Sequence, residues 1–238
     1  MSHNHGPKIV RDGLLNCYDA SNPKSYPGSG TVWTDLVSKG SINLSNLYSF
    51  DSGIALNTRS NTFATVPFTF GYNMTFELWY KTYQAATGFS TQFQSPGIIQ
   101  LGTYASSTSF TLWDWSVNTV GVHNIRTYVA NGSVWSYVID PPRTFTDSEW
   151  LKYHHIVMVF NGATGWTSYS LYIDTVLMFT QSITPAVTSL SGGNNVIFPG
   201  ANGGYENNSY SSLKIYNKSL SQNEIIRNYN ATKRKFGL

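Results

Sequence analysis

The sequence has little charge and almost no cysteine. Charged residues make up 11% of its 238 residues, against about 25% in an average soluble domain. Ser, Thr, Asn, Gly and Tyr must therefore form most of the surface. Cys17 is the single cysteine, which excludes a disulfide within the chain. Buried apolar surface and sheet pairing must then supply the stability.

Long hydrophobic runs are also missing. No stretch approaches 18 consecutive apolar residues, which excludes a membrane-spanning helix. The N-terminal MSHNHGPKIVRDGLL has no long apolar run and no small-residue cleavage site, so we expect no signal peptide and synthesis in a reducing cytoplasm. The net charge is +3, and Lys233, Arg234 and Lys235 account for it. We expect this tip to be a solvated terminus, which leaves no basic face for nucleic acid.

Aromatic residues and alternating strands are abundant. Aromatics make up 15% of the chain and hydrophobic residues 41%, enough for a sizeable core. In MTFELWYK, Met74, Phe76, Leu78 and Tyr80 fall on one face of a strand. KYHHIVMVF is apolar on both faces, which indicates a strand in the middle of a sandwich. Several similar short runs follow, separated by Gly, Pro, Asn or Ser.

This pattern predicts an all-β sandwich or barrel. A parallel α/β fold would need a helical pattern after each strand, and the sequence has none. No change in composition suggests a linker. We therefore predict an N-terminal arm over residues 1–12 and a single domain over residues 13–238.

One short helix is predicted at the C-terminus. Ser221 and Glu224 form a capping box, and Ile225, Ile226 and Tyr229 follow on one helical face. About ten residues make a marginal helix in isolation, so it must dock its Ile face on the sheets. We expect it to cover an open edge or end of the sandwich.

Three stretches, taken in order, resemble a known family. MTFELWYK, then WLKYHHIVMVFNG with SLYID, then SSLKIYNKSLSQNEIIRNYNATKRKFGL resemble the concanavalin A-like, laminin-G-like jelly-roll family. The resemblance implies a two-sheet antiparallel jelly-roll sandwich with one short C-terminal helix. GLLNCYDASNPKSYPGSGTVWTDL and the closing NYNATKRKFGL are similar to a narrower group, the structural proteins of tailed bacteriophages.

The sequence departs from the family at two points. Asp174-Thr175 stands where the family favours Asp-Gly, and Thr resists positive φ, so a loop longer than a type I′ turn is expected. GANGGYENNSYSSLKIYN lacks the Asp-Glu pair that often precedes the penultimate strand of the family. No calcium site is therefore carried over from the resemblance.

Enzymatic chemistry finds little support in the residue spacing. A retaining glycosidase needs two carboxyl groups about 5–5.5 Å apart, and among the acidic residues only Asp147 and Glu149 are close enough in sequence. FTDSEW reads as a turn leading into a strand, where both acids would stabilise the turn. Cys17 reads as a small buried hydrophobe. We expect no enzyme and no cofactor, with a glycoside hydrolase as a remote alternative.

A metal site is not expected either. His154 and His155 are adjacent in a predicted strand and point to opposite faces, so they cannot easily share one ion. The resemblance implies that His155 is structural and bonds across the sheet. No cluster of acidic residues is present to supply calcium ligands.

Aromatic side chains give the one candidate binding site. Trp113 and Trp115 share a strand face in LWDWS, and Tyr205 lies in a glycine-rich stretch. On an exposed face these side chains would stack on a glycan; on the inner face the tryptophans would be core, which is the favoured reading.

The resemblance and the composition together predict a non-enzymatic virion structural protein. It would decorate the capsid or attach to the tail, collar or fibre, and display a lectin-like sandwich on the particle surface. Its partners would be other virion proteins and copies of itself, with no nucleic acid and no membrane. The alternative is a carbohydrate-binding module that recognises host surface glycans.

Overall fold

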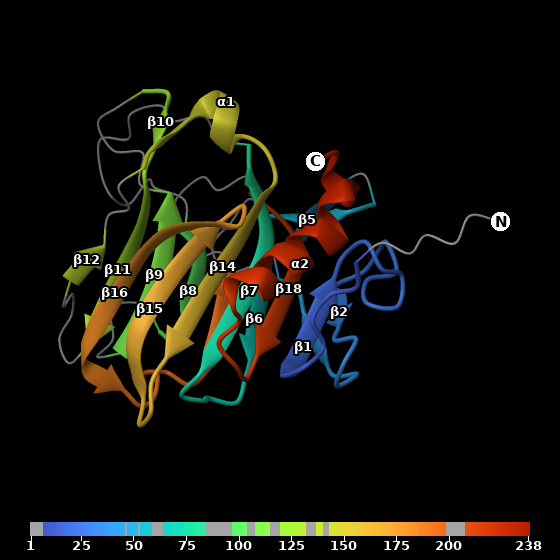
Figure 1. Cartoon of the computed structure of the whole chain (residues 1–238). Coiled ribbons are helices and arrows are strands. Elements are labelled where there is room, and N and C mark those ends of the chain that lie inside the picture. The colour runs from blue at the N-terminus through green and yellow to red at the C-terminus, as the bar shows by residue number, and fades with distance from the viewer. Residues whose placement is uncertain are drawn as a thin grey trace.

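The protein is a sandwich of two antiparallel β-sheets (Figure 1). The computed structural model describes residues 7–45, 47–51, 53–58, 64–83, 97–103, 108–114, 120–131, 137–139, 143–198 and 208–238. The predicted fold class, an all-β two-sheet jelly-roll sandwich with a short C-terminal helix, is confirmed.

The larger sheet has eight strands. Their bounds are β1 (Leu14–Asp19), β4 (Leu47–Asp51), β5 (Ala55–Thr58), β7 (Met74–Thr82), β14 (His154–Asn161), β15 (Trp166–Ile173), β16 (Val176–Val187) and β18 (Asn208–Tyr216). They run in the order β16-β15-β14-β7-β18-β5-β4, and β1 also pairs with β18. The centre of this sheet thus joins strands from the middle and the end of the chain.

The smaller sheet has six strands in the order β12-β11-β9-β8-β17-β6. Their bounds are β6 (Ala64–Pro67), β8 (Gly97–Leu101), β9 (Thr108–Asp114), β11 (Ile125–Asn131), β12 (Tyr137–Ile139) and β17 (Asn195–Phe198). Two short ribbons flank the sandwich, β2 (Val32–Thr34) with β3 (Ser41–Asn43), and β10 (Val122–His123) with β13 (Phe145–Thr146).

The helices are few among the described residues. They are α1 (Asp147–Trp150), α2 (Gln222–Thr232) and the 3-10 turn η2 (Lys233–Phe236). None of the helices in this part of the chain is long and apolar enough to cross a membrane.

Alternating side chains fill the space between the sheets. The four residues of β7 assigned to one face, Met74, Phe76, Leu78 and Tyr80, all belong to this core, as predicted. The aromatic ring of Phe160 on β14 lies 4.1 Å from that of Trp166 and 5.0 Å from that of Tyr169. β14 is buried on both faces, so its predicted place in the middle of the sandwich is confirmed.

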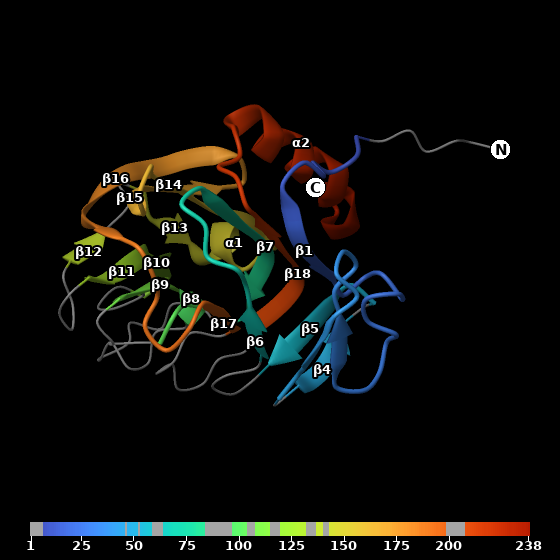
Figure 2. The same ribbon diagram turned by 90° about the horizontal axis from the view of Figure 1, so that it is seen from below.

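The C-terminal helix begins where the capping box predicts. The Ser221 side chain accepts from the backbone N–H of Glu224, and the Glu224 carboxylate accepts from the backbone N–H of Ser221. The expectation that this helix covers an edge or an end is wrong. It lies across the outer face of the larger sheet (Figure 2), where Ile225 packs against Val157 and Val159 of β14. This outer face is apolar enough to need a cover.

The hairpin between β15 and β16 also departs from expectation. The strands pair up to Ile173 and Val176, so Asp174 and Thr175 form a two-residue loop with φ of 49° and 73°. Positive φ at both positions is the type I′ geometry that we expected Thr to prevent. The Asp174 carboxylate accepts from the backbone N–H of His155, and its own N–H donates to the His155 carbonyl. These bonds offset the local cost.

Candidate functional site

Trp113 lies on the face of the smaller sheet that points away from the core. Its neighbour in β9, Leu112, belongs to the core, and alternation along the strand places Trp113 on the other face. The Trp113 ring lies 5.5 Å from that of Tyr128 on β11 and is 1% exposed. Trp115 and Tyr205 lie outside the described residues. A glycan platform built from these tryptophans and Tyr205 stays a prediction.

A buried charged cluster lies beneath α2, on the outer face of the larger sheet. Glu77 Oε1 is 2.6 Å from Lys214 Nζ and 3.1 Å from His155 Nε2. The side-chain amide of Asn228, on α2, donates to Glu77 Oε2 over 2.5 Å and to the Tyr216 hydroxyl over 2.9 Å. The Asn228 amide therefore ties the helix to β7 and β18, and His155 contacts Glu77 across the sheet, in line with the structural role that the resemblance implies.

The electrostatics of this cluster suit a structural role. Burial by itself would raise the pKa of Glu77, but the positive charges of Lys214 and His155 outweigh it and lower the pKa from 4.5 to about 2. Burial opposes the charged form of Lys214, yet Glu77 raises the pKa of that amine. Glu77 stays ionised at neutral pH, so it cannot act as the general acid of a glycosidase.

A second carboxylate–histidine cluster lies at the end of the sandwich near α1. His123 Nδ1 is 2.6 Å from Asp114 Oδ2, and His123 Nε2 is 2.8 Å from Asp147 Oδ1. Burial lowers the pKa of His123, but the hydrogen bonds and charges of the two aspartates outweigh this and raise it. Sequence reasoning missed the cluster because its members are distant in the chain and follow no spacing rule.

His154 and Glu149 have structural partners too. His154 Nδ1 lies 2.6 Å from Asp174 Oδ2, and its Nε2 lies 3.0 Å from the Glu149 carbonyl oxygen. Glu149 is the N3 residue of the α1 capping box, and its side chain accepts from the Thr146 backbone N–H. FTDSEW thus forms a strand and one helical turn. His154 and His155 take partners on opposite sides of the sheet, as predicted.

A cavity of about 240 Å³ opens beside His154. Its lining combines apolar side chains with charged groups of both signs, namely Ile173 and Val176, Arg143 and Lys152, and Glu149 and Asp174. The Arg143 guanidinium lies 4.6 Å above the Phe145 ring. Apolar walls with charged groups at the rim are typical of a pocket for a small polar ligand. No sequence signal marks this cavity, because its lining comes from four separate segments.

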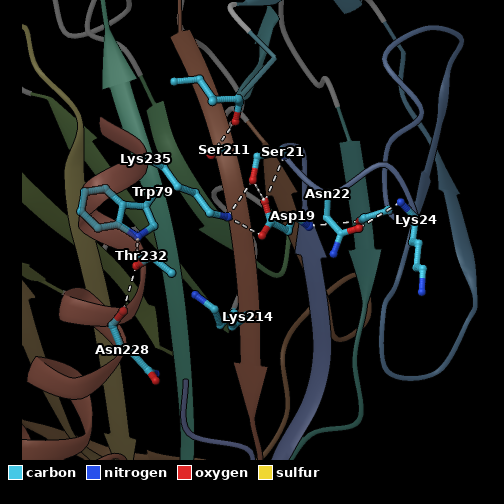
Figure 3. A network of polar contacts seen from close by, with 12 residues as sticks. Asp19, Ser21, Asn22, Lys24, Trp79, Ser211, Lys214, Asn228, Thr232 and Lys235 are labelled. Carbon is cyan, nitrogen blue, oxygen red and sulfur yellow. Dashed lines mark hydrogen bonds and ion pairs between the residues drawn. The ribbon is translucent and has the colours of Figure 1, made fainter. Parts of the chain in front are cut away.

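The two chain ends meet on the outer face of the larger sheet. Figure 3 shows Lys235 reaching Asp19 and Ser21, at 2.6 and 2.7 Å from its amine. The ring of Phe236 stacks on that of Trp79 with their centroids 4.2 Å apart. The expected solvated tip is confirmed in part, because Arg234 and Lys235 are exposed. The tip is also anchored, since Lys235 pairs with Asp19 and Phe236 packs on Trp79, two partners that are remote in the sequence.

Cys17 is buried in β1, as predicted. Burial raises the pKa of its thiol to about 11, so the thiol is protonated and unreactive at neutral pH. The neighbouring Asp35 carboxylate accepts from the backbone N–H groups of Cys17 and Val37. Burial opposes its ionisation, but these hydrogen bonds lower the pKa of Asp35.

The carboxylates described so far are committed to protein partners. Glu77, Asp114, Asp147 and Asp174 each bond a histidine or a lysine. Within the described ranges, no group of three or more His, Cys, Asp or Glu side chains is arranged to hold a metal ion.

Comparison with solved structures gives the fold context. The chain resembles a Trypanosoma rangeli sialidase in complex with the inhibitor DANA, with a TM-score of 0.63 and 15% identity, over 97% of this chain and 34% of that one. It resembles the botulinum neurotoxin serotype D binding domain with a TM-score of 0.60 and 14% identity, over 94% and 53%. The botulinum neurotoxin type G receptor binding domain matches with a TM-score of 0.61 and 12% identity, over 92% of this chain and 51% of that one. At such identities the likeness concerns the fold alone, and the chain spans only part of each structure.

Sequence comparison is more specific. No curated protein sequence matches the chain. The family described as "Concanavalin A-like lectin/glucanases superfamily" matches residues 52–226. Because this match covers well over half of the chain, the protein belongs to the concanavalin A-like lectin/glucanases superfamily.

Proposed function

We propose that the chain is a non-enzymatic structural protein of a tailed-bacteriophage particle, where it displays a lectin-like sandwich on the surface. It is made in the host cytoplasm and binds other virion proteins and neighbouring copies of itself. The stretches that are similar to phage structural proteins, residues 13–36 and 228–238, lie outside the family match to residues 52–226. These stretches distinguish this chain from a generic lectin-like sandwich.

The observation that carries the proposal is the contact between the N-terminal segment and the C-terminal helix, which together cover the outer face of the larger sheet. The Val10 backbone N–H donates to Asn228 Oδ1 over 2.7 Å, and Lys235 bonds Asp19. The two segments form a layer that lies over the outer face of the larger sheet (Figure 2). In this proposal the added layer is the side that attaches to the particle, and the opposite side of the sandwich is displayed.

The absence of enzymatic activity belongs to the same proposal. The described carboxylates near the histidines are held by partners, and Glu77 is ionised and fully buried. A panel of polysaccharides incubated with the protein should show no release of reducing ends. Turnover that disappears with one carboxylate variant, such as Asp147→Asn, would contradict this part.

Mass spectrometry of gradient-purified particles tests the main proposal. The chain should co-purify with the major capsid or tail proteins at a fixed copy ratio, whereas an early non-structural phage protein should be lost. Lysine-specific labelling of intact particles then adds orientation: Lys152, exposed beside the cavity, should be labelled as in the isolated protein. A chain that is abundant in the infected lysate but missing from purified particles would refute a virion role.

A specific observation favours carbohydrate binding as a second candidate function. The cavity beside His154 has a size and a mixed lining suited to a sugar unit. The similar solved structures include a sialidase in complex with sialic acid and a neurotoxin receptor binding domain. Such binding could serve a virion protein during attachment to a host surface.

A glycan array probed with the intact protein tests this second candidate. A signal from the cavity should fall at least tenfold with Lys152→Ala, while Lys81→Ala, a change outside the cavity, leaves it unchanged. A signal that instead depends on Trp113→Phe would assign binding to the smaller sheet. Absence of any signal from the intact protein would remove this candidate.

A further inference from the structure

The net positive charge of the chain is confined to its two ends. Residues 1–51 and 227–238 hold eight Lys and Arg against four Asp and Glu, a net charge of +4. Residues 52–226, which the family match covers, hold seven against eight, a net charge of −1. Because the ends pack together, the structure concentrates this charge on one side of the molecule.

Each acid of the two ends has a protein partner. Asp19 pairs with Lys235, and Asp12 pairs with Lys218. Asp35 is fully buried and bonded by backbone N–H groups. Asp51 accepts from the Tyr83 hydroxyl. Among the described residues of the two ends, most of the basic side chains are exposed, whereas Asp12 is the only exposed acid.

An apolar hollow lies among those basic side chains. Its volume is about 390 Å³, and it is lined by Ile9, Arg11, Leu14, Cys17, Leu36 and Val37. Val37 is 44% exposed. The aliphatic side chains of this hollow come from the N-terminal segment, β1 and the turn that follows β2.

Four exposed cations surround the hollow: Lys8, Arg11, Lys39 and Arg227. Arg11 lines it directly. Lys39 donates to the carbonyl of Leu36, a lining residue, and Arg227 donates to the carbonyl of Lys8, next to Ile9. No ion pair links these four to an acid among the described residues. We call this surface the basic hollow.

We propose that the basic hollow is a docking site for an acidic segment of another virion protein. One apolar side chain of the partner enters the hollow, and its flanking carboxylates pair with Lys8, Arg11, Lys39 and Arg227. An apolar anchor within a polar rim is the usual anatomy of a protein interface. This inference rests on the proposed function, and it names the surface and the interactions by which the protein would attach to another virion protein.

The lining favours a protein over a nucleic acid. Single-stranded nucleic acids are held on aromatic side chains that stack with bases, whereas the hollow is lined by aliphatic side chains. Four cations could attract phosphates as well as carboxylates, but the lining of the hollow offers no aromatic ring on which a base could stack. The experiment below separates the two.

A random dodecapeptide library selected against the full chain provides the test. Enriched peptides should combine Asp and Glu with Leu, Ile or Phe. A selected peptide should bind the Arg11→Glu/Lys39→Glu variant at least tenfold more weakly, and should lose affinity as salt is raised. Val37→Asp, which puts a charge into the hollow, should weaken binding similarly.

The control is a matched charge reversal elsewhere. Arg143→Glu/Lys152→Glu changes two exposed cations at the cavity near α1 and should leave binding intact. The proposal is overturned if no peptide is enriched, if enriched peptides are neutral or basic, or if both double variants lose affinity equally. It is also overturned if a single-stranded oligonucleotide binds the hollow more tightly than the peptides. None of these outcomes depends on finding the chain in virions, so the proposed function can fail separately.

Discussion

The two faces of the larger sheet are both buried, but they are buried in different ways. The inner face is apolar and packs against the smaller sheet through rings such as Phe160, which contacts Phe110 of β9. The outer face alternates apolar residues with Glu77, His155 and Lys214. A second sheet covers the inner face, whereas the two chain ends cover the outer one.

The difference shows how each cover is specified. Apolar burial is strong but non-directional, so the inner face requires only residues of suitable size and alternation. The outer face requires a cover whose polar groups match its charges, since an unpaired buried charge is costly. Asn228 meets that demand, because its amide bonds Glu77 and its carbonyl oxygen accepts from Val10. Polar matching thus determines where the helix and the N-terminal segment dock.

The largest effect is expected on the inner face. Phe160→Ala removes a fully buried ring that contacts Trp166 and Tyr169, and it should lower the free energy of unfolding by about 3–5 kcal/mol. Urea denaturation followed by tryptophan fluorescence measures this change. Val176→Ala, at a side chain that is 51% exposed, should stay within about 0.5 kcal/mol. Equal effects of the two variants would show that the inner face is not packed as described.

The outer face should respond to charge balance rather than to volume. Lys214→Met leaves Glu77 buried without its closest cation and should cost about 3 kcal/mol. The double variant Glu77→Gln/Lys214→Met removes both charges and should cost less than Lys214→Met alone. Chemical denaturation of the three proteins at pH 7 gives the comparison.

The pH dependence checks the same cluster. Because the pKa of Glu77 is lowered from 4.5 to about 2, its stabilisation is present above pH 4.5 and is lost as the pH falls towards 2. Glu77→Gln should therefore differ from the parent most at neutral pH. If the double variant Glu77→Gln/Lys214→Met were less stable than Lys214→Met alone, the charge-balance explanation would be contradicted.

Local patterns were enough to predict the elements of the fold. Alternation in MTFELWYK assigned the inner residues of β7, and Ser221 with Glu224 located the start of α2. The docking place of α2 could not be predicted, because the apolar stripe at Ile225 fits an edge or a face equally well. Its partners Val157 and Val159 lie on a strand remote in sequence. The Asp174-Thr175 turn was missed for the same reason, since His155 stabilises it from another strand.

The candidate site was less predictable than the fold. Alternation places Trp113 on one face of β9 but does not say which face points to the core. The cavity beside His154 and the basic hollow are each lined by several separate segments. Local sequence carries no mark of such surfaces, because the topology alone brings their residues together.

The cluster at His123 tests whether a histidine can stabilise a buried carboxylate, Asp114, in place of a lysine. Here the histidine is the cation, and its pKa is raised. Its stabilisation is present below the ordinary value of 6.5 and is lost as the pH rises above it. His123→Gln should therefore cost more at pH 6, about 1–2 kcal/mol, than at pH 9. Denaturation at both pH values measures the difference. A cost independent of pH would mean that the imidazole packs there uncharged.

The smallest effect is expected at the half-buried turn between β15 and β16. Thr175 is a β-branched residue at φ 73°, a conformation that glycine adopts without strain. Thr175→Gly should therefore raise the free energy of unfolding by about 0.5–1 kcal/mol. Gln181→Gly, in the exposed middle of β16, should instead lower it by a similar amount, because glycine weakens a strand interior. Thermal denaturation of the two variants compares these opposite signs. A lower free energy of unfolding for both variants would show that the turn is not strained in the parent protein. The bonds between Asp174 and His155 would then fix this hairpin, as polar contacts fix the docking of α2.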